Sequence, residues 1–184
     1  MGGIYLLGRQ DGTVVSGNVV HDIYASFYGG EGLYADEGSS NMLFEYNVCY
    51  NVSADCFYLH YGSSNVVRNN VFAYAGDYLI RGPHNEGQVG IMTYNNVLIP
   101  DDRPAYNCSP LYLASDNNLI LTNGKGLDMA MVGEDKFALE CVRSDFGWDV
   151  HSIVKEYAGE DYIELTQTQT AKKLGIKPIE KISN

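Results

Sequence analysis

Asn70-Val71-Phe72-Ala73 is one of five places in the first two thirds of the chain where asparagine precedes a short apolar run. The others are Asn18-Val19-Val20, Asn47-Val48-Cys49-Tyr50, Asn96-Val97-Leu98-Ile99 and Asn118-Leu119-Ile120-Leu121. Successive asparagines are 29, 23, 26 and 22 residues apart. A short strand that recurs at such a period, with glycine and asparagine between, is typical of a solenoid whose coils stack about 4.8 Å apart. The sequence therefore predicts an all-β, parallel β-helix, in which equal repeat positions form columns of neighbouring side chains.

A second repeated segment precedes three of these asparagines. It reads Gly3–Gly8, Gly32–Gly38 and Cys56–Gly62, with a looser copy at Asp77–Gly82. Because successive strand side chains point to opposite faces, we expect one apolar face in the core: Ile4, Leu6, Leu33, Ala35, Phe57, Leu59, Tyr78 and Ile80. The glycines that end the copies suit the bends between strands. The recurring asparagine predicts a ladder of stacked side-chain amides along the axis.

The opposite face of the same segments carries the best site candidate. Its expected columns are Tyr5, Tyr34, Tyr58 and Leu79; Leu7, Asp36, His60 and Arg81; and Gly3, Gly32, Cys56 and Asp77. A merely solvated face would favour Lys, Glu, Ser and Thr. The chain also has 15 tyrosines against 6 phenylalanines, and tyrosine suits a surface that stacks on and hydrogen-bonds a polar ligand. An alternative is that tyrosine simply decorates exposed strands.

Composition narrows the function classes. The net charge of −11 argues against binding a phosphate backbone, so no nucleic-acid partner is expected. No apolar run approaches the ~20 residues of a membrane span, and no signal-peptide pattern is present. The localisation therefore stays open, with a secreted or cell-surface parent protein compatible. The four cysteines and four histidines lack zinc or disulfide-framework spacing, so we expect plain thiols and no metal site.

The repeat divides the chain into two parts. Residues 1–124 carry the coils, and the pattern fades in residues 125–184, which we expect to cap the exposed core of the last coil. Within that tail, residues 166–174 are expected to form a short helix that ends before Gly175 and Pro178. Met1-Gly2-Gly3 enters a coil with no capping segment. We therefore expect this chain to be the C-terminal coils of a longer solenoid, and the N-terminal coils of the same protein would then pack against it as a partner.

Three stretches carry a family resemblance: Gly32–Ser40, His60–Gly62 and Val67–Ala73. They resemble the right-handed parallel β-helix proteins of bacterial carbohydrate metabolism and, more narrowly, β-helix glycoside hydrolases related to β-xylosidases, xylanases and fucosidases. Two tail segments are similar to the closing part of those proteins, Trp148–Ser152 and Ala171–Ile179. The resemblance implies a glycoside hydrolase that needs no cofactor. It implies an oligo- or polysaccharide partner, derived from plant or host glycans, in a groove on the helix face.

The resemblance also implies a pair of catalytic carboxylates. Asp36, in Asp36-Glu37-Gly38-Ser39-Ser40, matches the family's catalytic aspartate. The second acid departs from the pattern, because His60 occupies the position one coil later. The later candidates are Asp77 and Glu86. Hydrolysis needs carboxyls about 5–5.5 Å apart for retention or about 6.5–9.5 Å apart for inversion.

Rung spacing ranks these acids. In the expected register Asp77 lies on the order of 16 Å from Asp36, whereas Glu86 belongs to an insertion, Gly82–Gln88, that would reach over the strip. The hypothesis is that Asp36 is the nucleophile or base and Glu86 the acid, with Glu37 as the rival acid. The residues expected to hold the sugar are Tyr34, Tyr58, His60, Arg81 and His84. Arg81 would alternatively pair with Asp36 and hold it ionised.

Two other functions stay open. A polysaccharide lyase would recruit Asp36, Glu37 and Arg81 around Ca²⁺, but that ion takes six to eight oxygen ligands and the columns cluster only two acids. A non-catalytic β-helix that binds glycans or acts as a spacer would show a tyrosine strip without a well-spaced second acid. Under that interpretation Asp36 and Glu37 simply form a polar turn.

Overall fold

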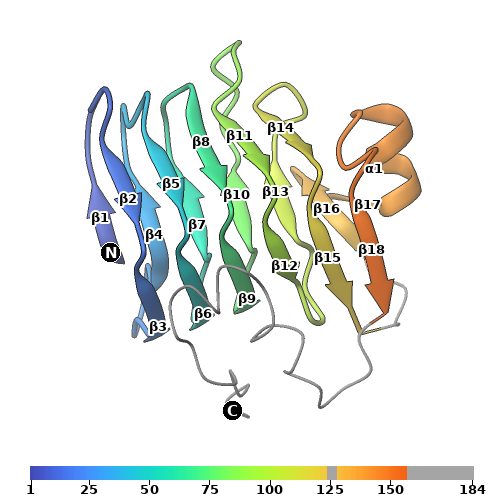
Figure 1. The fold of residues 1–184 in the computed structure, drawn as a ribbon, viewed down its shortest axis with the longest axis horizontal. Helices are drawn as coiled ribbons and strands as arrows, with labels where there is room; N and C mark the ends of the chain where they lie inside the picture. The colour runs from blue at the N-terminus through green and yellow to red at the C-terminus, as the bar shows by residue number, and fades with distance from the viewer. Residues whose placement is uncertain (124–127, 157–184) are drawn as a thin grey trace.

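A computed structural model describes residues 1–123 and 128–156 of the chain. These residues form a parallel β-solenoid of about five turns, in which each coil contributes one strand to each of three sheets (Figure 1). The all-β, parallel β-helix expected from the repeat is confirmed. Within the described part of the chain, the helix α1 (Leu139–Asp145) is the single α-helix, and no helix is long and apolar enough to span a membrane.

The strand bounds show the three-strand repeat directly. The first sheet contains β1 (Gly2–Leu6), β4 (Glu31–Ala35), β7 (Phe57–Leu59), β10 (Ile80–Gly82), β13 (Tyr106–Cys108), β16 (Asp128–Val132) and the antiparallel β17 (Asp135–Ala138). The second contains β2 (Val14–Ser16), β5 (Leu43–Glu45), β8 (Asn65–Arg68), β11 (Ile91–Tyr94) and β14 (Leu113–Asp116). The third contains β3 (Val19–Ile23), β6 (Val48–Val52), β9 (Val71–Ala75), β12 (Val97–Ile99), β15 (Leu119–Thr122) and β18 (Ile153–Glu156).

The predicted asparagine ladder is present along the bend between the second and third sheets. Each amide Nδ2 donates to the Oδ1 of the next asparagine, at 2.9 Å from Asn18 to Asn47, 3.1 Å to Asn70, 3.0 Å to Asn96 and 3.2 Å to Asn118. The residue before each of these asparagines has positive φ, which bends the chain sharply. The ladder therefore helps to fix the coil spacing, because Asn47, Asn70 and Asn96 are each buried between two other asparagines.

The expected core face is confirmed in the first three coils and needs a correction in the fourth. Leu33, Ala35, Phe57 and Leu59 are fully buried. In the fourth coil, however, the strand is shifted by two residues, because Ile80 and not Tyr78 pairs with Phe57. A shift of two preserves the alternation of faces, so the sequence pattern alone does not reveal it.

The coils continue beyond the boundary drawn at residues 124 and 125. β16 and β18 pair in parallel with the strands of the preceding coil. The buried Trp148 packs in the core at this end, and its Nε1 donates to the Leu113 oxygen at 3.0 Å. The asparagine ladder ends here, where Asn118 donates to Asp149 at 3.1 Å. The helix expected at residues 166–174 lies outside the described residues.

Candidate functional site

Asp36 follows β4 directly, at the bend from the first sheet to the second. Its side chain is 18% exposed. Oδ2 accepts a hydrogen bond from the Tyr5 hydroxyl at 2.5 Å. Oδ1 accepts from the Tyr34 hydroxyl at 3.1 Å and the Glu37 backbone N–H at 2.8 Å, and it lies 2.9 Å from Nδ1 of His60. Side chains from three successive coils therefore converge on this carboxylate.

These contacts set the charge of Asp36. Burial by itself acts to raise the pKa of the carboxyl group, but the hydrogen bonds from Tyr5, His60 and the Glu37 backbone outweigh it and lower the pKa to about 2. Asp36 is consequently ionised at any ordinary pH. A carboxylate in this state can act as a base, as a nucleophile or as an acceptor for a hydroxyl group, and it has no proton to give as an acid.

A cluster of rings borders Asp36 on the side of the next coil. The His60 ring lies 4.5 Å from the Tyr61 ring and 5.0 Å from the His84 ring, measured between centroids. Tyr61 and His84 are stacked, with centroids 3.9 Å apart and planes at 17°. Burial, together with the neighbouring His60, lowers the pKa of His84. The structure thus brings the predicted site residues His84 and His60 together. It also places Tyr61 in this cluster; the sequence analysis did not name Tyr61 as a site residue, although it directly follows His60.

The two candidate acids differ in their surroundings. Glu86 is exposed, and its Oε2 accepts the backbone N–H of Gly62 at 2.8 Å, so the loop after β10 does fold back onto the previous coil. Gly62 lies against the backbone of Ser39 in the preceding coil, and the Ser39 N–H donates to the Asp36 backbone oxygen at 3.0 Å, so Glu86 is anchored at the same bend as Asp36. Glu37 is exposed on the turn itself; the pKa of Tyr5 is raised chiefly by the hydrogen bond to Asp36, and the charge of Glu37 adds a smaller contribution.

The tyrosine column is present but largely covered. Tyr34 and Tyr58 are stacked with centroids 5.0 Å apart, and Tyr5 meets Tyr34 edge-on at 5.3 Å. Tyr34 and Tyr58 are only 4% and 5% exposed. Burial raises the pKa of both hydroxyls, that of Tyr58 to about 12. In this arrangement Tyr34 positions Asp36 through its hydroxyl, and the more exposed ring beside the carboxylate is Tyr5.

Arg81 lies elsewhere than the sequence suggested. The two-residue shift in the fourth coil places it opposite Tyr58, with its guanidinium 5.0 Å from that ring. It pairs with Asp55 at 3.5 Å instead of with Asp36. The expectations that Arg81 continues the Asp36 column and holds that aspartate ionised are therefore wrong. The hydrogen bonds from Tyr5 and His60 keep Asp36 ionised instead.

Asp55 and Glu31 form a buried acidic pair that the sequence reasoning missed. The register places them opposite each other on β4 and the segment before β7, and they are 0% and 2% exposed. Burial raises the pKa of Asp55 to about 8, although Arg81 opposes this. The sequence does contain a pattern that could have predicted this pair, because an acidic residue stands at the same repeat position in two coils, directly before Gly32 and before Cys56. Asp77 is exposed near this pair, and its charge also raises the pKa of Asp55.

No group of three or more His, Cys, Asp or Glu side chains within residues 1–123 and 128–156 is arranged to hold a metal ion. Cys49, Cys56 and Cys108 are buried free thiols and Cys141 is an exposed one. The chemistry at Asp36 is that of an ionised carboxylate beside imidazole and phenol groups.

Comparison with known proteins adds one finding. A family model described as a right-handed β-helix region matches residues 2–125. Searches of curated proteins and of solved structures gave no significant match.

Proposed function

Because this chain belongs to the right-handed β-helix family, we propose that it is a carbohydrate-active member, a glycoside hydrolase in which Asp36 is the ionised carboxylate. One observation carries the proposal. Asp36 is partly exposed and is held ionised by donors from three coils, and its partner His60 lies beside the stacked rings of Tyr61 and His84. Rings of this kind offer a surface for a sugar, and the carboxylate offers a base or nucleophile.

Glu86 is the proposed acid. Its Oε2 accepts the Gly62 backbone N–H at 2.8 Å, which brings this carboxyl group to the bend that carries Asp36. An inverting enzyme would need the two carboxyl groups about 6.5–9.5 Å apart. In that arrangement Asp36 would activate a water molecule on one side of the sugar ring while Glu86 protonates the leaving oxygen on the other. Glu37 is the rival acid, because it follows Asp36 on the same exposed turn. His60 and His84 would contact the sugar between the carboxyl groups.

A non-catalytic glycan-binding protein is the second candidate. One feature favours it: each hydrogen-bond partner of Asp36 in the described residues is a donor, and none is a second carboxyl group. A carboxylate so fully engaged serves a binding surface as well as it serves catalysis. The two functions differ in whether the glycan is cleaved.

The Asp36→Asn variant separates the two functions. Oligosaccharides from plant and host glycans, including xylo-oligosaccharides and fucosylated glycans, are tested for release of reducing ends and for affinity by calorimetry. The hydrolase proposal predicts turnover that falls at least a thousandfold in Asp36→Asn while affinity is retained. Asp116→Asn is the matched control, because Asp116 also pairs with a histidine, His151 at 2.7 Å, far along the solenoid.

The possible outcomes distinguish the two proposed functions. Wild-type binding without turnover would establish the glycan-binding alternative, and equal turnover in both variants would refute the role of Asp36. Where the wild type does cleave, Glu86→Gln and Glu37→Gln identify the acid. The true acid variant should lose least on substrates with a good leaving group, because such a group departs without protonation.

A further inference from the structure

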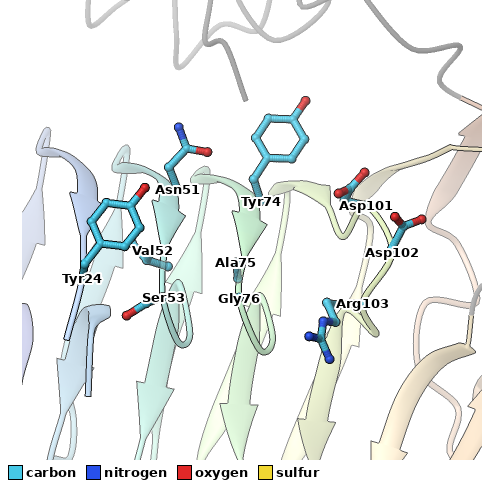
Figure 2. A pocket seen from close by; sticks show the side chains of 10 residues that line it. All are labelled: Tyr24, Asn51, Val52, Ser53, Tyr74, Ala75, Gly76, Asp101, Asp102 and Arg103. Atoms are coloured by element: carbon cyan, nitrogen blue, oxygen red, sulfur yellow. The ribbon is translucent and has the colours of Figure 1, made fainter. Parts of the chain in front are cut away.

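A groove separate from the Asp36 site opens along the ends of the third sheet. Its volume is about 490 Å³, within the range of about 300–1,000 Å³ that ligand sites occupy. Asp36 lies at the bend from the first sheet to the second, whereas this groove follows the turns that leave the third sheet. Figure 2 shows the lining residues: Tyr24, Asn51, Val52, Ser53, Tyr74, Ala75, Gly76, Asp101, Asp102 and Arg103.

The groove runs parallel to the solenoid axis, because four successive coils each contribute residues at the end of one strand of the third sheet or just after it. Ile23, Val52 and Ala75 pair across the first three coils. Three coil spacings amount to about 14 Å. An open channel of that length, with a repeated element at each rung, suits an extended chain of similar units better than one compact molecule.

Part of the groove lining is made of small residues. Ser53, Ala75 and Gly76 belong to it, and a Cβ atom at Gly76 would collide with the Ser53 carbonyl oxygen. Glycine is therefore required at residue 76 for the neighbouring coil to approach this closely.

The walls carry the mixture of groups that recognises a neutral sugar. Figure 2 shows Tyr24 at one end and Asp101, Asp102 and Arg103 at the other. Tyr24 is 55% exposed, so its ring can stack on a sugar face, while the carboxylates and guanidinium accept from and donate to hydroxyl groups. The net charge of −11 and the paired aspartates disfavour a polyanionic chain.

Tyr74 lines the groove from a backbone position in the left-handed region. Its φ is 53°, in the left-handed region, and the residues that pair with this position in the two preceding coils are Asn51 at 50° and Asp22 at 55°. Asparagine and aspartate adopt this conformation readily, whereas a bulky aromatic residue rarely does. Tyr46, which precedes the ladder residue Asn47, has the same conformation at a φ of 55°, so this backbone belongs to the bends of the coils; what distinguishes Tyr74 is that its side chain lines the groove.

We propose that this groove binds a segment of a neutral oligosaccharide lying parallel to the solenoid axis, with Tyr24 as the stacking surface. The inference rests on the proposed function in its choice of ligand class, since a carbohydrate-active protein needs to hold a polymer as well as to act on it. The groove and Asp36 are separate sites, so each can fail without the other.

The test uses the full chain carrying Asp36→Asn, so that bound sugar is not consumed. Its affinity for xylohexaose, cellohexaose and mannohexaose is measured by calorimetry, with and without Tyr24→Ala. The expected result is about tenfold weaker binding of at least one hexasaccharide, a size typical of a residue that anchors a ligand. Phe27→Ala is the control, because Phe27 is 102% exposed in the same loop and lies outside the groove; it should leave the affinity unchanged.

Arg103→Ala is a second variant at the opposite end of the groove, and it should weaken the same hexasaccharide. Unchanged affinity in both groove variants would overturn the proposal, as would binding of hexagalacturonate in preference to every neutral hexasaccharide. No binding of any neutral hexasaccharide would overturn it too. The turnover of the single Asp36→Asn variant reports on the proposed function separately. If that measurement refutes the hydrolase proposal, the groove proposal still holds provided that Tyr24→Ala weakens binding.

Discussion

Replacing Asn70 with alanine should remove the centre of the asparagine ladder and strongly destabilise the solenoid. Asn70 is 1% exposed. Its Oδ1 accepts from the Asn47 backbone N–H at 2.9 Å and from the Asn47 amide at 3.1 Å, and its Nδ2 donates to the Phe44 oxygen at 3.0 Å and to Asn96 at 3.0 Å. One side chain thus satisfies polar groups in the coils on both sides.

The magnitude follows from what is left unpaired. The Asn47 backbone N–H loses the acceptor the structure gives it, while the Asn47 amide keeps its bond to the Val15 oxygen and Asn96 keeps its bond from the Asn70 backbone. A fully stranded buried group costs about 1–3 kcal/mol, and the loss of the other bonds adds to that. We therefore expect Asn70→Ala to lower the free energy of unfolding by about 3–5 kcal/mol.

The assay is urea unfolding followed by far-ultraviolet circular dichroism, with Asn18→Ala as the matched control. Asn18 stands at the first rung and is partly exposed, and Asn47 Oδ1 keeps a bond from its backbone N–H at 3.1 Å when the side chain is removed. It should lose only about 0.5–1.5 kcal/mol. Equal losses in the two variants would refute the reasoning that burial within the ladder, and not the residue type, sets the stability.

Three further predictions use the site and its surroundings. Tyr5→Phe removes a hydrogen bond that lowers the Asp36 pKa of about 2, so the acid limb of kcat/KM should move to higher pH, as a pH–rate profile would show. The Asp55 pKa of about 8 lies above its unfolded value of 3.8, so the folded state holds an extra proton in between and stability falls from pH 4 to pH 8. Asp55→Asn should remove that part of the slope in urea titrations. Gly62→Ala places a Cβ against a backbone oxygen of the preceding coil at a φ of 141°, whereas Gly12→Ala, at 80°, meets open space; thermal unfolding should show a far larger loss at residue 62.

Each of these has a contradicting result. An acid limb that stays in place after Tyr5→Phe would mean that the tyrosine does not control the charge of the carboxylate. Identical pH slopes in the wild type and Asp55→Asn would show that the buried carboxyl does not take up a proton. Similar melting temperatures for the two glycine variants would contradict the close packing of neighbouring coils at Gly62.

The fold was open to prediction because it repeats. Asparagine at one position, an apolar strand after it and glycine at the bends are local signals, and their recurrence identifies a stacked structure without any long-range information. The register shift in the fourth coil could not be predicted, because a two-residue slip keeps Ile80 on the core face and a polar residue on the outer face of the sheet. In the observed register Arg81 reaches the buried Asp55 of the preceding coil, and this contact between coils is invisible in either segment alone.

The site was predictable to the same extent. The column that joins Asp36 to His60 followed from the repeat, as did the approach of the loop that carries His84. The burial of Tyr34 could not be foreseen, because alternation tells which face a residue lies on but not what covers that face. The groove that contains Tyr24 escaped for a different reason, since its lining combines the ends of strands with the residues after them, and the side chains at equal repeat positions differ in chemistry from coil to coil.

The most direct test of the account is a crystal structure of Asp36→Asn with the oligosaccharide that the wild-type protein cleaves or binds. The account predicts a sugar ring within hydrogen-bonding distance of the residue 36 side chain and against the Tyr61 and His84 rings, with Glu86 facing it from the loop. Sugar found only away from residue 36, with the Tyr61–His84 pair untouched, would contradict the claim that this bend is where the protein acts on glycans.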